Sequence, residues 1–289
     1  MRSARERAWA KLNLALDVLG PQPDGYHGMR MIMLSCTLCD EVRVALTPDG
    51  SFSAHSNLFF LPGDRRNIAV RAAELFMETI GERSWGVRID MKKRTPVCAG
   101  LGGGSSDAAA VLRALDRLTG AQLGREKLSE LAFKLGADVP FCVGGGMCLA
   151  EGRGEVLTRL RAMPECGIVI CKPRFPISTP ELFSRIDSRS GPPGPDMPAM
   201  LAAIGRGDLE GICANMRNVF EDVLSPEHAE IFEIKRALTE RGALGSLMTG
   251  TGSAVFGIFG SKTAARSCAD ALSERYRECF FAEPKKAVM

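Results

Sequence analysis

Residues Pro96 to Asp107 read Pro-Val-Cys-Ala-Gly-Leu-Gly-Gly-Gly-Ser-Ser-Asp, and the strongly helix-forming run Ala-Ala-Ala-Val-Leu-Arg-Ala-Leu follows directly. Glycine has no Cβ, so a backbone this rich in glycine can approach another group closely. Free N–H groups that lead into the N-terminus of a helix form a site for anions, and phosphate is the usual one. We therefore expect a phosphate-binding loop here, rather than the flexible surface turn that clustered glycines otherwise indicate.

The composition is that of an ordinary globular enzyme. The chain has 289 residues, of which 45% are hydrophobic and 25% charged, enough for one large domain or two moderate ones. A formal net charge of +3 is too small to indicate nucleic-acid binding through the electrostatic field of the protein alone. Two Trp and two Tyr residues do not make a stacking platform for single strands. We expect no nucleic-acid partner.

The apolar runs, the first residues and the cysteines indicate the cellular compartment that we expect for the protein. No apolar run reaches the roughly 18 residues of a membrane helix, and the first residues lack a signal-peptide pattern. The ten cysteines are scattered, and Cys36 with Cys39 forms a C-x-x-C pair that no second pair follows at zinc-site spacing. We expect reduced thiols in a cytoplasmic protein, with no membrane partner and no metal held by protein ligands alone.

Strand and helix patterns alternate in both halves, and we place the domain boundary near residue 160. Strands are predicted at 8–19, 29–37, 41–46, 85–91, 147–150, 167–171, 254–259 and 279–282. Helices are predicted at 68–80, from the Gly-rich loop to about 118, and at 126–135, 198–205, 209–215, 227–241 and 262–276. Another helix should begin near Pro180, and the Pro/Gly-rich segment 188–198 should be a loop.

Three polar residues outside the Gly-rich loop are candidates for chemistry. Lys11 and Asn13 are two apart in a strand pattern, so they share one face, which could equally be the solvated face of an edge strand. Asp138 follows a helix end and precedes an apolar run that we predict to be a strand. An acid at that place bonds turn amides or acts in a reaction, and the local sequence leaves both open.

The two commonest phosphate motifs do not fit the Gly-rich loop. A P-loop requires G-x-x-x-x-G-K-[ST], and the chain contains no Gly-Lys dipeptide. The dinucleotide fingerprint G-x-G-x-x-G would need glycine at position 105 or 107, where the chain has Ser105 and Asp107.

The remaining combination resembles the GHMP kinases, a superfamily of small-molecule kinases. Three stretches match its motifs in order: Lys11-Leu-Asn-Leu, the run from Pro96 to Ala109, and Gly250-Thr-Gly-Ser. Three further stretches are similar to one branch of that superfamily, namely Asp24-Gly-Tyr-His, Leu135-Gly-Ala-Asp-Val-Pro and Ala150-Glu-Gly-Arg-Gly-Glu. The acceptor of that branch is 4-diphosphocytidyl-2-C-methyl-D-erythritol, an intermediate of the non-mevalonate route to isoprenoid precursors. The resemblance covers nearly the whole chain.

The resemblance implies an α+β fold of two domains. An N-terminal domain of ribosomal-S5-like topology, residues 1–160, would carry ATP, and a ferredoxin-like domain, residues 161–289, would pack against it. Mg²⁺ is expected with ATP, held mainly by phosphates and water because no acidic cage is visible in the sequence. The residues that the match places around ATP are Asn67, Pro96, Gly100, Leu101, Gly102, Gly103, Gly104, Ser105 and Ser106.

The same match assigns the reacting groups and the acceptor site. Asp138 falls at the catalytic base, with Lys11 beside it. Tyr26 and Phe183 would stack on cytosine, and hydrogen bonds from His27 would supply base specificity. The basic residues 92–94 would border adenine together with Asn67. The acceptor positions as a whole are Asn13, Tyr26, His27, Phe183, Thr249 and Gly250.

Two other functions stay open at this point. A GHMP kinase for a small acceptor such as homoserine or mevalonate would have no need of a base-stacking pair. A nucleotide-binding regulator without catalysis would need neither Lys11 nor Asp138. Trp9, Leu34 and Thr249 depart from the residues usual in the branch, and the last two leave the polarity of the pocket open. Oligomeric state, as monomer or homodimer, is also open.

Overall fold

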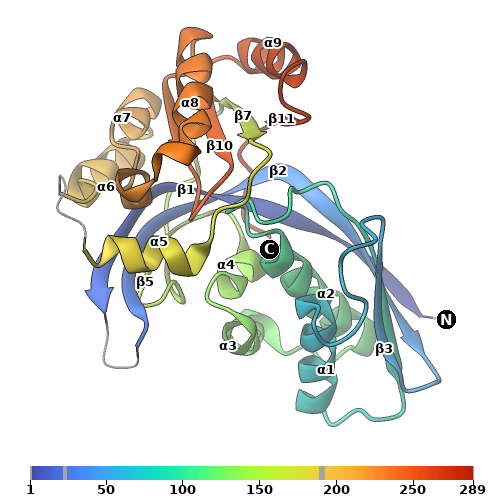
Figure 1. Cartoon of the computed structure of the whole chain (residues 1–289). Helices are drawn as coiled ribbons and strands as arrows, with labels where there is room; N and C mark the ends of the chain where they lie inside the picture. Colours follow the sequence, from blue (N-terminus) through green and yellow to red (C-terminus); the bar gives the residue numbers. More distant parts are fainter. Residues whose placement is uncertain (1, 22–24, 189–192, 289) are drawn as a thin grey trace.

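The computed structural model describes residues 2–21, 25–188 and 193–288. Asp24 of the Asp-Gly-Tyr-His motif lies outside them, as do residues 189–192 of the predicted loop 188–198. In Figure 1 two long strands cross the middle of the molecule, with one group of helices below them and the C-terminal sheet and helices above. No helix in the described ranges combines the length and apolarity needed to cross a lipid bilayer.

The two long strands, β1 (Ser3–Pro21) and β2 (His27–Thr47), pair antiparallel and form the centre of a seven-stranded sheet. The main path of that sheet runs β3 (Phe52–Ser56), β4 (Gly86–Lys92), β2, β1 and β8 (Arg217–Asn218). The hairpin of β5 (Met147–Glu151) and β6 (Val156–Arg159) pairs with the first part of β2.

The predicted break in β2 at residues 38–40 was wrong. Strand β2 runs on through these residues, and Asp40, which is fully buried, lies opposite Ala8 just before a register shift between Trp9 and Lys11. Its Oδ1 accepts hydrogen bonds from the backbone N–H groups of Arg94 and Thr95, at 2.6 and 2.7 Å. An acid in mid-strand is stable here because donors more than 50 positions away along the sequence satisfy it.

Four helices cover one face of this sheet (Figure 1): α1 (Ile68–Thr79), α2 (Gly103–Thr119), α3 (Gly124–Leu135) and α4 (Val139–Gly144). The first three confirm the predicted helices. The strand predicted after Asp138 was wrong, because α4 occupies that run. All six of its residues are buried, so the sequence showed no helical period, and Pro140 is tolerated in the first turn, where its missing N–H costs nothing.

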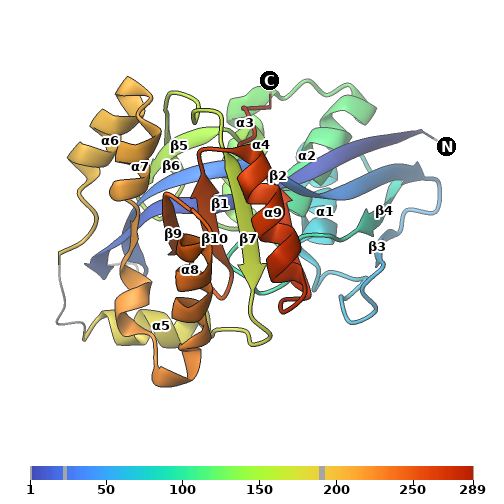
Figure 2. The ribbon, with the colours of Figure 1, turned by 90° about the horizontal axis from the view of Figure 1, so that it is seen from above.

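The C-terminal half folds as the ferredoxin-like unit that the resemblance implied. Along the chain come β7 (Gly167–Lys172), α8 (Glu230–Glu240), β9 (Gly245–Met248), β10 (Val255–Phe259), α9 (Lys262–Ser273) and β11 (Glu278–Ala282). The antiparallel sheet has the order β11-β7-β10-β9, with α8 and α9 over one face (Figure 2). Inserted between β7 and α8 are α5 (Thr179–Ile186), α6 (Met197–Arg206), α7 (Leu209–Ala214), β8 and two short 3₁₀ turns, Val219–Val223 and Pro226–His228.

The two halves share a hydrophobic core and backbone pairing. Leu12 and Ile32 of the first sheet pack in one buried cluster with Ile170 and Phe256 of the second. β8 pairs with β1, and the C-terminal tail returns to the first half, where the N–H of Lys285 donates to the carbonyl of Ser35. The second half thus contributes β8 to the sheet of the first half, and the boundary near residue 160 stays a prediction.

Candidate active site

Hydrogen bonds hold the three motif segments together. The N–H of Lys11 donates to the carbonyl of Leu101 at 2.9 Å, which joins β1 to the Gly-rich loop. The N–H of Ala254 donates to the carbonyl of Ala99, which joins the same loop to the C-terminal half. The Thr249 hydroxyl accepts from the N–H of Asn13 at 3.1 Å. The Gly-rich loop is therefore held from both sides.

Glycine is required where the loops touch. Gly100 has φ +73°, and a Cβ added there would lie 2.1 Å from the carbonyl oxygen of Thr249. Gly102, at φ +67°, would place a Cβ 2.9 Å from Cγ of Lys11. Helix α2 begins at the next residue, Gly103. The glycines thus let Lys11 and the loop at Thr249 lie directly against the start of the helix.

Lys11, Asn13 and Asp138 meet at this junction. The Lys11 ammonium donates to Oδ1 of Asn13 at 2.7 Å and lies 3.5 Å from Oδ2 of Asp138. The Lys11 side chain is 5% exposed and that of Asp138 is 33% exposed, so the carboxylate can meet a ligand while the ammonium stays behind it. A Cβ on Gly250 would lie 3.3 Å from Lys11 Nζ. Lys11, Asn13, Asp138, Thr249 and Gly250 thus form one group.

A cavity of about 400 Å³ opens beside this group over the Gly-rich loop. Its wall combines apolar side chains such as Leu61, Ile68 and Met91 with the backbone of the loop and the first turn of α2. The cavity suits a nucleotide, because its apolar side chains can contact the base and the N–H groups at the start of the helix favour the phosphates. The predicted residues that line it are Asn67, Pro96, Gly100, Leu101, Gly102, Gly103, Gly104 and Ser105.

Two of the predicted nucleotide residues also have structural roles. Oδ1 of Asn67 accepts from the N–H of Ala69 and so caps α1, while its amide donates to the carbonyl of Pro62. Ser106 is buried, and its hydroxyl donates to the carbonyl of Gly103 within α2.

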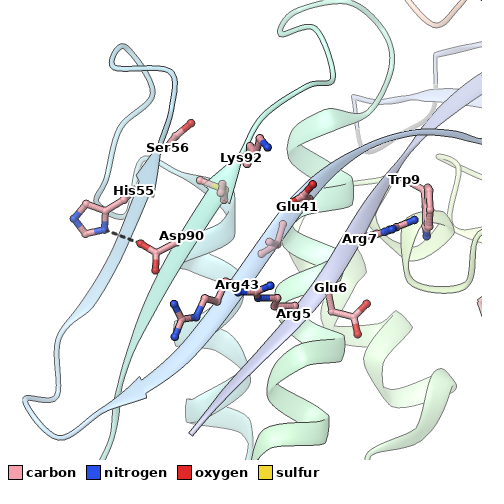
Figure 3. A pocket seen from close by; sticks show the side chains of 12 residues that line it. Arg5, Glu6, Arg7, Trp9, Glu41, Arg43, His55, Ser56, Asp90 and Lys92 are labelled. Carbon is pink, nitrogen blue, oxygen red and sulfur yellow. Dashed lines mark ion pairs between the residues drawn. The ribbon is translucent and has the colours of Figure 1, made fainter. Parts of the chain in front are cut away.

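A second cavity, of about 850 Å³, lies over the outer face of the first sheet (Figure 3). Its side chains alternate in charge along the strands, as Arg43 beside Glu41 and Asp90 beside Lys92 show. His55 lies 4.0 Å from Asp90, the ion pair drawn in Figure 3. The Gly-rich loop does not border this cavity but lines the smaller one, so the smaller one is the candidate active site.

The basic residues 92–94 do not all face the cavity as free charges. Lys93 is 4% exposed, and its ammonium contacts Oδ2 of both Asp40 and Asp107, each at 2.5 Å. Burial raises the pKa of Asp107 to about 7, and the Lys93 ammonium opposes part of that rise. Oδ1 of Asp107 has no hydrogen-bond partner within the part of the chain that the structure describes. This charge cluster forms the floor under the Gly-rich loop.

The predicted acceptor residues Tyr26, His27 and Phe183 lie in two groups of packed side chains. The His27 and Phe183 rings lie 4.8 Å apart, and Nε2 of His27 lies 2.7 Å from Oδ1 of Asp187. The Tyr26 ring is covered by the guanidinium of Arg153, whose Cζ is 3.5 Å from the ring centroid. That Tyr26 and Phe183 sandwich a base stays a prediction.

The sequence missed Asp40, Asp107, Arg153 and Asp187 as parts of this region. Asp107 and Arg153 stood within quoted motifs, but the sequence assigned neither of them a role of its own. Asp40 and Asp187 carried no local signal, because their partners lie more than 50 positions away along the chain. Of the departures from the family pattern, Leu34 is buried in the core, and Thr249 uses its hydroxyl to join Asn13 to the Gly-rich loop.

Two family models match the chain. The model for the GHMP kinases N terminal domain covers residues 67–146, and that for GHMP kinases C terminal covers residues 200–278. A 4-diphosphocytidyl-2-C-methyl-D-erythritol kinase from Clostridium tetani is 38% identical over 277 residues, which are 96% of this chain and 98% of the relative. A kinase of the same name from Caldicellulosiruptor saccharolyticus is 40% identical over 272 residues, 94% of this chain and 93% of the relative.

Solved structures agree with these matches. A 4-(cytidine 5'-diphospho)-2C-methyl-D-erythritol kinase superposes with a TM-score of 0.81 at 35% identity, covering 97% of this chain and 99% of the other. A homoserine kinase from Cytophaga hutchinsonii gives 0.78 at 19% identity, covering 99% and 96%, and shows the fold alone. The chain belongs to the GHMP kinase family. Within it, the chain falls among the 4-diphosphocytidyl-2-C-methyl-D-erythritol kinases.

The close approach at Gly100 can be tested against a matched glycine. Gly120 has φ +71°, like Gly100, but a Cβ there would meet nothing within 4 Å. We expect Gly120→Ala to lower the free energy of unfolding by about 1–2 kcal/mol through backbone strain alone. Gly100→Ala should cost at least about 2 kcal/mol more, because the methyl group collides with Thr249. Equal losses in urea unfolding would contradict the contact.

Asp107 should make stability depend on pH. Folded Asp107 holds its proton up to about pH 7, whereas in an unfolded chain it releases it near pH 4. The folded state therefore binds more protons between these values, so this group lowers the free energy of unfolding as the pH rises through that window. In Asp107→Asn this contribution of residue 107 to the pH dependence of the free energy of unfolding should be lost.

Urea unfolding of the wild type and of Asp107→Asn between about pH 5 and pH 8 measures this effect. The quantity to compare is the slope, against pH, of the difference between their free energies of unfolding. Asp208→Asn is the control, since a hydrogen bond from the N–H of Gly211 already lowers the pKa of that exposed carboxylate. This control should leave the slope unchanged in the same window. Parallel curves for wild type and Asp107→Asn would refute the role of Asp107.

Proposed function

We propose that this protein transfers the γ-phosphoryl group of ATP to the 2-hydroxyl of 4-diphosphocytidyl-2-C-methyl-D-erythritol. The observation that carries the proposal is the pairing of Asp138 with Lys11 beside a cavity floored by the Gly-rich loop. Relatives at 38–40% identity carry the name of that kinase. The reaction places the enzyme in isoprenoid precursor biosynthesis by the non-mevalonate route.

The cavity fits a nucleoside triphosphate. Its apolar side, with Leu61 and Ile68, suits the adenine ring, and Asn67 borders the same space. The amides of Gly102 to Ser105 and the N-terminus of α2 would hold the phosphates, since they supply N–H donors and a positive end of the helix dipole. Mg²⁺, held mainly by phosphate and water oxygens, would supply neutralising charge.

Asp138 would take the proton of the acceptor hydroxyl. The hydroxyl oxygen then bonds to the γ-phosphorus as the bond to the β,γ-bridging oxygen breaks, and ADP leaves. Lys11 would stabilise the negative charge on the transferred group, because its ammonium lies 3.5 Å from the base. Asn13 fixes that ammonium through a 2.7 Å hydrogen bond.

Tyr26, His27 and Phe183 would recognise the cytosine end of the acceptor. His27 is held by Asp187, so one ring nitrogen is oriented and the other is available to the base. Thr249 and Gly250 would line the acceptor near the transferred phosphoryl, since both lie against Lys11 or Asn13. The ten cysteines are free thiols, which suits the reducing cytoplasm in which we place the enzyme.

The purified chain should consume ATP with 4-diphosphocytidyl-2-C-methyl-D-erythritol and not with homoserine, mevalonate or galactose. A small acceptor cannot use the aromatic wall, so its kcat/KM should be lower by at least about a hundredfold. A coupled assay of ADP release gives the comparison. Lack of turnover with the cytidyl acceptor, or preference for another acceptor, would overturn the proposal.

Asp138→Asn tests the base. We expect kcat to fall by roughly 10²–10⁴-fold, because the amide cannot accept the proton, while the dissociation constant for ATP stays within a few-fold. Asp90→Asn, on the outer face of the sheet, should keep wild-type turnover. Wild-type kcat in Asp138→Asn would remove Asp138 from the mechanism.

A further inference from the structure

The Tyr26 ring is more than half exposed. It lies just before β2, beside residues that the structure does not describe. A tyrosine so exposed has several rotamers of similar energy unless something packs on its ring. A neighbour from elsewhere in the chain packs on the face of this ring.

That neighbour is Arg153. Its Cζ lies 3.5 Å from the centroid of Tyr26, the thickness of one stacked layer, and 5.4 Å from the ring of Phe133 on α3. A guanidinium stacks flat on aromatic rings and is attracted by their faces. Arg153 thus lies over the Tyr26 ring and also within reach of Phe133, so it links Tyr26 to a helix.

The turn that carries Arg153 is itself anchored. The carbonyl of Gly152 accepts from the N–H of Met29 at 2.7 Å, and the N–H of Arg153 donates to Oε2 of Glu155 at 2.7 Å. A Cβ on Gly154 would lie 3.6 Å from the carbonyl oxygen of Ala137, the residue before Asp138. The guanidinium is therefore held by a turn in contact with both β2 and the segment of the base.

The opposite wall has its own support. Phe183, on α5, packs on the His27 ring at 4.8 Å and on Phe220 at 5.0 Å, and Asp187, which directly follows that helix, contacts His27. The Tyr26 ring is instead covered by a long, charged side chain.

We propose that Arg153 is a positioning residue of the acceptor site, holding the Tyr26 ring by stacking so that it is ready to receive the acceptor's base. The inference rests on the proposed function, which places a cytosine against Tyr26. Without Arg153 the ring would have to be ordered at the moment of binding, at a cost in affinity. The nucleotide cavity is untouched by this change, because Arg153 does not line it.

Binding of cytidine and of cytidine diphosphate, measured by calorimetry, tests the inference without turnover. In Arg153→Met both dissociation constants should rise by a similar factor, roughly five- to tenfold. Arg153→Lys should recover little of the loss, since an ammonium has no planar face. KM for the acceptor should rise in step, while KM for ATP stays unchanged. Arg30→Met is the matched control, for it removes one positive charge near the same hairpin, where Arg30 pairs with Glu151.

A double-mutant cycle shows whether Arg153 acts through Tyr26. In a Tyr26→Leu background, Arg153→Met should cause no further loss of cytidine affinity. The same fold loss in both backgrounds would overturn the inference, as would unchanged binding in Arg153→Met. A loss confined to cytidine diphosphate would also overturn it, by showing a direct phosphate contact. If the wild type binds neither cytidine compound, it is the proposed function that fails.

Discussion

A single close approach of two backbones joins the halves of this molecule at its site. The carbonyl oxygen of Thr249 occupies the space where residue 100 would carry a side chain, and the Thr249 hydroxyl bonds to Asn13 on β1. The Gly-rich loop therefore lies between β1 and the C-terminal half, and it lines the cavity at the start of α2. An anion site made of backbone groups needs such a rigid surround, because its geometry has no side chains to adjust it.

Two lysines near the loop have opposite roles, and the difference comes from their partners. Lys93 is enclosed by Asp40 and Asp107, so its charge is neutralised in the floor. A buried cluster of this kind is weak evidence for stability, since desolvation offsets much of the attraction. Lys11 has one carboxylate neighbour, Asp138, which is one-third exposed. Its charge is therefore the one that we propose acts on the transferred phosphoryl group.

The acceptor site that we propose is assembled from distant parts of the chain. One wall of it comes from Phe183 on α5 and from Asp187, which directly follows that helix. The other comes from the start of β2 and the turn between β5 and β6. Because both walls depend on contacts between elements, small changes in packing would alter recognition of the base more than binding of the nucleotide.

The amino-acid sequence by itself determined the parts whose signals are local: the helices with a clear 3.6-residue period, the Gly-rich loop at a helix start and the pairing of Lys11 with Asn13 on one strand face. The ferredoxin-like order of the second sheet followed from family motifs rather than from periodicity. Only the tertiary structure decided that β2 runs through Asp40, because the donors to that carboxylate lie in a distant segment. It likewise decided that a helix follows Asp138, since a run buried on every side has no period. The tertiary structure also decided that Arg153 packs on Tyr26. The two residues are 127 positions apart, and no sequence pattern predicts stacking between them.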